Sequence, residues 1–147
     1  AGFSALICQG FFILPSMLKS VSPQFTTGHV LTTVRRGWMK NHHDARDILH
    51  PGFWITILVM QLAAEEIIFR GVYLHYFLNE GPLLAITIST LLFVLMEIFF
   101  MPSLRSAVFP IVGALVIGAV HGYLFTQVPT LIPLILSHLV FFIIVVL

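Results

Sequence analysis

Charged residues are scarce in this sequence. Only 9% of its 147 residues are Asp, Glu, Lys or Arg, whereas hydrophobic residues make up 59%. Soluble domains usually carry about 25% charged residues. So few charges cannot cover the surface of a water-soluble domain of this size, and the same composition excludes a disordered chain. The sequence therefore indicates a protein that lies in a membrane.

Two further shortages exclude other classes of protein. Cys8 is the only cysteine, which excludes an intramolecular disulfide framework and a zinc site built from cysteines. The seven Lys and Arg residues leave a formal net charge of +1 and form no large basic surface, so nucleic acid is not an expected partner. The partner that the composition predicts is the lipid bilayer.

What the sequence has instead is long apolar runs. A membrane-spanning helix needs about 20 mostly apolar residues. Runs of this kind predict an all-α, polytopic transmembrane helix bundle of about five spans, forming a single domain over residues 1–147. The predicted spans are Ala1–Leu18, Phe53–Leu78, Pro82–Met101, Ser106–Phe125 and Pro129–Leu147.

The first span has a second interpretation. Ala1–Leu18 resembles a signal peptide in length, but it lacks a basic n-region and a clear cleavage site, so a span is favoured. The chain opens on Ala1 rather than Met and stops inside an apolar run. We therefore expect that it is a fragment or is trimmed at its ends.

A basic segment sets the expected orientation in the membrane. Five of the seven Lys and Arg residues lie between the first two spans, in the polar loop 19–52. Cytoplasmic loops carry an excess of Lys and Arg. We therefore expect an integral, multi-pass membrane protein with loop 19–52 in the cytoplasm, which places Glu80 outside and Arg105 inside.

Five ionisable side chains lie inside the predicted spans: Glu65, Glu66, Arg70, Glu97 and His138. Such groups are costly in a bilayer, so they normally face the protein interior and have a function. A rise of 1.5 Å per residue places Glu65 and His138 near mid-membrane and Glu97 toward the cytoplasmic end of its helix. These three groups are predicted to converge on a common wet pocket.

The geometry within the second span is more definite. Glu66 and Arg70, at positions i and i+4, share a helix face and are predicted to form an ion pair. Glu65 is turned about 100° away and lacks this partner, a setting that suits a general base or a proton-sharing acid. The alternative for each of these groups is a structural role as a bond between helices.

Other residues in the spans are assigned packing or no role. Ala114, Gly118 and Gly122 recur every four residues, a pattern of small residues that predicts close helix packing. His75 and His121 are expected at the outer ends of their spans, where contact with water explains them, so neither is predicted to have a function.

Three motifs in order carry a resemblance to a known family. Residues 65–70 have the form E-E-x-x-x-R, residues 93–97 have the form F-x-x-x-E, and His138 follows in the last span. Over about residues 53–147 the chain resembles the CAAX-protease and bacteriocin-processing family (CPBP, or Abi) of intramembrane proteases. The resemblance implies an endopeptidase that hydrolyses a peptide bond of a membrane-associated peptide or protein, prenylated as in CAAX processing or a bacteriocin leader.

The resemblance also assigns roles. Glu65 corresponds to the glutamate that activates water, and Glu66 and Arg70 correspond to its supporting pair. His138 corresponds to the final His of the family, which stabilises the oxyanion together with an Asn four residues later.

Two positions depart from the family pattern. Glu97 stands where the His of F-x-x-x-H is expected, and Phe142 stands where the Asn of H-x-x-x-N is expected. In the family that His helps the glutamate to orient water. Phe142 has no hydrogen-bond donor, and the loss of one oxyanion donor typically costs about 10²–10³ in rate.

Two mechanisms are compatible with these residues. In the first, Glu65 and Glu97 share a proton as a carboxylate pair and activate water between them, while His138 supports the oxyanion. In the second, the same three residues hold a divalent metal such as zinc. The metal-free mechanism is favoured, so no cofactor is expected.

Two further functions stay open. The first is a family member that has lost catalysis and is a structural or substrate-binding subunit of a membrane complex, which the two altered positions favour. The second is a transporter or proton relay, because buried carboxylates and histidines also mark such paths. No broken-helix pair or internal repeat supports that last interpretation.

Overall fold

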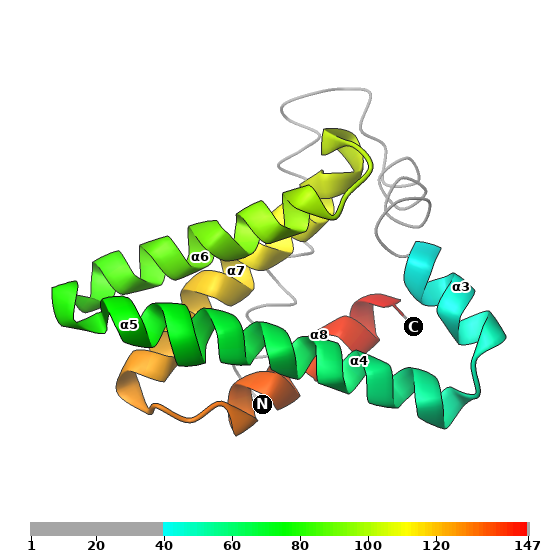
Figure 1. Cartoon of the computed structure of the whole chain (residues 1–147), viewed down its shortest axis with the longest axis horizontal. Helices are drawn as coiled ribbons and strands as arrows, with labels where there is room; N and C mark the ends of the chain where they lie inside the picture. Colours follow the sequence, from blue (N-terminus) through cyan, green and yellow to red (C-terminus); the bar gives the residue numbers. More distant parts are fainter. Residues whose placement is uncertain (1–39, 147) are drawn as a thin grey trace.

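The computed structural model describes residues 40–146, and the regular elements in that part of the chain are all helices (Figure 1). In chain order they are α3 (Lys40–Ile48), α4 (Pro51–Glu66), the π-helix η1 (Ile67–Leu74), α5 (His75–Phe77), the 3₁₀ turn η2 (Leu78–Glu80), α6 (Pro82–Phe99), α7 (Leu104–Gln127) and α8 (Ile132–Val146). The predicted all-α bundle is confirmed.

Three helical stretches are long and apolar enough to cross a membrane: Pro51–Glu80, Pro82–Phe99 and Ser106–Gln127, with mean hydropathies of 1.6, 2.1 and 2.0. They correspond to the second, third and fourth predicted spans. The fifth predicted span is a shorter apolar helix, α8, and the first lies outside the described residues. The protein is therefore a helical membrane protein.

The polar segment 19–52 between the first two predicted spans is partly helical, because α3 forms in it. Ala45 and Arg46 favour helix. Ala45 and Leu49 also pack against the apolar cluster around Trp54, which gives this otherwise polar segment a buried side. The earlier part of the loop lies outside the described residues.

Local signals set the ends of the membrane helices. At the start of α4, the His50 ring accepts a hydrogen bond from the amide of Gly52 at 3.3 Å, and Pro51 occupies the first turn, where its missing N–H costs nothing. Between η2 and α6 the chain reverses at Gly81, which has φ +119°. Only glycine adopts that conformation readily, so the sharp turn that sets α6 back along η1 depends on it.

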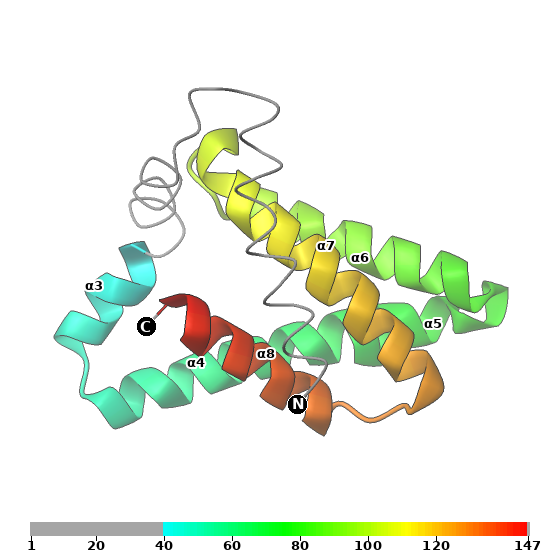
Figure 2. The same ribbon diagram turned by 180° about the vertical axis from the view of Figure 1, so that it is seen from behind.

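Helices α6 and α7 make the most extensive contact between described helices and lie side by side in both views (Figures 1 and 2). A Cβ atom built on Gly118 would lie 2.6 Å from Cγ2 of Thr90, and one on Gly122 would lie 3.1 Å from Cγ2 of Ile86. The packing predicted for this row of small residues is confirmed.

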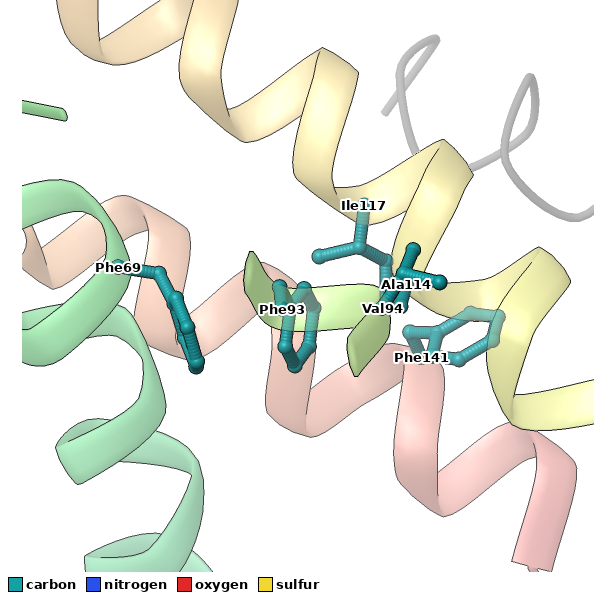
Figure 3. Packing of buried hydrophobic residues seen from close by; sticks show 6 residues of the cluster. All are labelled: Phe69, Phe93, Val94, Ala114, Ile117 and Phe141. Carbon is teal, nitrogen blue, oxygen red and sulfur yellow. The ribbon is translucent and has the colours of Figure 1, made fainter. Parts of the chain in front are cut away.

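Apolar side chains from four elements form the central core. Figure 3 shows Phe69 of η1, Phe93 and Val94 of α6, Ala114 and Ile117 of α7, and Phe141 of α8. Two smaller clusters lie beside it. One consists of Trp54, Leu58, Leu62 and Phe142, and the other of Leu74, Ala85, Phe125 and Leu134. Helix α8 packs along α4, where Figure 2 shows the two crossing.

Candidate active site

The two glutamates of the E-E-x-x-x-R motif end α4, and Arg70 lies in the π-helix that follows. Glu66 and Arg70 are both fully buried, and Nε of Arg70 lies 3.4 Å from Oε2 of Glu66, so the ion pair predicted from their spacing is present. The guanidinium carbon of Arg70 lies 4.9 Å from the centre of the Phe93 ring, which adds a cation–π contact.

The π-helix is a feature that the sequence did not predict. A π-helix widens the turn and disturbs the regular backbone hydrogen bonds, and it is found often at functional sites. Backbone groups inside a membrane need a partner within the protein. Here Oγ of Ser89 on α6 donates to the carbonyl oxygen of Phe69 at 2.6 Å. Ser89 thus ties α6 to the turn that carries Arg70.

Glu66 is the centre of the hydrogen-bond network. Its Oε1 atom lies 3.0 Å from Nδ1 of His121 on α7 and 2.9 Å from Nδ1 of His138 on α8. Nε2 of His121 lies 3.3 Å from Oγ of Ser137. One carboxylate therefore joins α4, α7 and α8 in the membrane interior.

His121 corrects the sequence interpretation. It was expected at a wet helix end without a role, but its side chain is fully buried and bonds to Glu66. Depth along a helix does not reveal which way a residue faces. The sequence signal that indicated its burial was its position three residues after Gly118, which puts it near the packed face of α7.

Glu65 also has partners, contrary to the expectation that it lacks one. Nε2 of Gln61 donates to its Oε1 at 3.1 Å, and its Oε2 lies 3.9 Å from Nε2 of His138. Glu65 and Glu66 thus face different nitrogens of one imidazole. With 9% of Glu65 and 5% of His138 exposed, both groups are at the edge of the buried region.

Glu97 joins this arrangement through a pocket. Glu97 and His138 both line it, and aromatic rings of Phe93, Phe109, Phe141 and Phe142 form much of its wall. The pocket has room for about one water molecule beside these two polar side chains. Glu65 is not among its lining residues, so the structure brings Glu97 to His138 rather than to a space shared with Glu65.

Phe142 explains why this pocket is largely apolar. Its ring is buried with Trp54, Leu58 and Leu62 and also reaches the pocket wall. At this position the family pattern expects an Asn, which would offer an N–H donor. The side chain present contributes packing between α4 and α8 and no such donor.

The metal-bound alternative does not fit the geometry. Within the described residues, no group of three His, Cys, Asp or Glu side chains converges at metal-binding distances. Glu65, Glu97 and His138 are therefore not arranged as a ligand set. Two of the three are instead engaged by other side chains: Glu65 by Gln61 on its own helix, and His138 by Glu66 on α4.

These features define a class of protein: a multi-helix membrane protein with buried carboxylates and imidazoles beside a small pocket. The family model described as Type II CAAX prenyl endopeptidase Rce1-like matches residues 48–144, which include all five predicted site residues. The chain belongs to this family, which confirms the resemblance to CAAX proteases. No curated protein and no solved structure matches the chain.

Proposed function

We propose that this chain is an intramembrane endopeptidase that hydrolyses a peptide bond of a membrane-associated peptide or protein. The observation that carries the proposal is the pairing of Glu65 with His138, whose Oε2 and Nε2 atoms lie 3.9 Å apart at the edge of a buried site. A water molecule within hydrogen-bonding reach of both groups has a general base on one side and an imidazole on the other.

In the proposed reaction, Glu65 takes a proton from water as the water oxygen attacks the peptide carbonyl carbon. The tetrahedral oxyanion then collapses, the carbon–nitrogen bond breaks, and the proton passes from Glu65 to the leaving nitrogen. The products are an amine and a carboxylic acid, which then loses its remaining proton to solvent. His138 supports the oxyanion, and Glu97 lines the small pocket beside His138, where it takes no step in the proposed reaction.

Glu66 and Arg70 support this chemistry without touching the reacting atoms. Glu66 holds the His138 ring by the Nδ1 atom at 2.9 Å, and Arg70 lies beside Glu66 with the opposite charge. A buried carboxylate without such partners would be costly in the membrane interior. We propose that the substrates are prenylated peptides or leader peptides, in keeping with membership of a CAAX-protease family. We also propose that they are cleaved at the cytoplasmic face, on the side where loop 19–52 lies.

The test is cleavage of a farnesylated CAAX peptide by the full chain in detergent. Glu65→Gln keeps the shape of the side chain and removes its ability to accept a proton, so cleavage is expected to disappear. Glu80→Gln, at an exposed carboxylate in the turn before α6, is the matched control and is expected to keep the wild-type rate. Activity in the Glu65→Gln variant equal to wild type would overturn the proposal. A chelator arm tests metal dependence separately.

A second function is favoured by Glu97 and Phe142: a family member that has lost catalysis and binds substrate or another subunit of a membrane complex. Under this alternative the wild-type chain binds the farnesylated peptide and does not cleave it. Glu97→His and Phe142→Asn together restore both family side chains. Cleavage by the double variant alone supports the alternative, and cleavage by wild type excludes it.

A further inference from the structure

The directions of the hydrogen bonds around Glu66 follow from its charge. Arg70 is fully buried, and the nearest anionic atom is Oε2 of Glu66 at 3.4 Å, so Glu66 provides the negative charge that a buried guanidinium needs. A carboxylate only accepts hydrogen bonds. Both ring nitrogens that face Oε1, at 3.0 and 2.9 Å, must therefore be N–H donors.

The same logic extends through His121 to α8. With its proton on Nδ1, a neutral His121 has a lone pair on Nε2 and accepts from the hydroxyl of Ser137, 3.3 Å away. Ser137 and His138 are neighbours on α8. Ser137 reaches Glu66 through His121, whereas His138 bonds to Glu66 directly, so α8 is held at two adjacent residues.

Arg70 explains why a second histidine is needed. Among the described residues, its Nε, Nη1 and Nη2 atoms have no hydrogen-bond partner despite full burial. These donors compete with His138 for the oxygens of Glu66. His121 holds Oε1 in the direction of α7 and α8, and thereby keeps the carboxylate from turning toward the guanidinium.

From this arrangement we propose that His121, with Ser137, is a positioning residue that holds Glu66 so that His138 carries its proton on Nδ1 and turns a proton-accepting Nε2 toward Glu65. His138 in this form has no proton on Nε2 and can accept a second proton there. It stabilises an oxyanion only after it has gained that second proton. The part of this inference that concerns catalysis rests on the proposed function, whereas the position of the proton does not.

The test is ¹⁵N NMR of the full chain, labelled at histidine and held in lipid nanodiscs. His138 is assigned by the signal that His138→Phe removes. In wild type, the proton of neutral His138 is expected on Nδ1. In His121→Phe, Glu66 is released toward Arg70, and a mixture of the two tautomers of His138 is expected. Wild-type His138 with its proton on Nε2, or an unchanged pattern in His121→Phe, would overturn the inference.

Two further variants separate positioning from folding. Asn places an amide N–H close to where the histidine Nδ1–H lies, so His121→Asn is expected to restore the single tautomer. Exposed His75, changed to Phe, is the matched control and is expected to leave the His138 signal unaltered. Should His121→Phe fail to fold, the wild-type tautomer and His121→Asn still decide the question. Because the NMR readout needs no cleavage, it stands even if the wild-type chain does not cleave the farnesylated peptide.

Discussion

Replacing Gly118 by alanine tests how closely α6 and α7 are packed. The added methyl group would lie 2.6 Å from Cγ2 and 2.9 Å from Oγ1 of Thr90. Atoms this close must move apart, and both sit on a short, branched side chain inside a helix, where little adjustment is available. Overpacking of this kind typically costs about 1–3 kcal/mol.

The helix itself prefers alanine to glycine by roughly 0.5–1 kcal/mol. Gly71→Ala is the matched control because its new methyl group would meet Leu131 Cδ1 at 3.4 Å, an ordinary contact. Gly71→Ala is therefore expected to leave the free energy of unfolding unchanged or slightly raised. The difference in the free energy of unfolding between the two variants isolates the packing cost and is expected to be about 1–3 kcal/mol.

The measurement is equilibrium unfolding in mixed micelles by increasing the mole fraction of SDS. Thr90→Ala in the Gly118→Ala background removes both crowding atoms and leaves Cβ at 3.0 Å, so it is expected to recover most of the loss. The Thr90 hydroxyl has no hydrogen-bond partner among the described residues, and its removal by itself breaks no bond. Equal stability of Gly118→Ala and Gly71→Ala would refute the close approach.

Two further predictions concern the buried polar groups. Ser89→Ala removes the donor to the Phe69 carbonyl and is expected to lower the free energy of unfolding by about 1–3 kcal/mol. Thr87→Ala is the control and is expected to have little effect, because the Thr87 hydroxyl bonds to the carbonyl of Leu83 in its own exposed turn. Glu66→Met and Arg70→Met are each expected to cost about 3–5 kcal/mol because each leaves one buried charge unpaired, whereas the double variant is expected to cost less than their sum. Additive losses in a double-mutant cycle would mean that the two charges do not depend on each other.

The sequence allowed prediction of the apolar helices, because a bilayer demands long apolar runs, and of the Glu66–Arg70 pair, because four-residue spacing stacks side chains on a helix. It did not allow prediction of the bond between Gln61 and Glu65, although that pair has the same spacing. The π-helix was beyond reach because no local propensity signals it. His121 was missed because its partners lie on α4 and α8, and only tertiary packing brings them together.

The narrow seam at Gly118 and Gly122 has a mechanical consequence. At these two glycines the side chains of Thr90 and Ile86 pack directly onto the backbone of α7, so α6 and α7 are expected to move as one rigid unit. Helix α8 joins this pair through Phe141 in the central core and through the bond between Ser137 and His121.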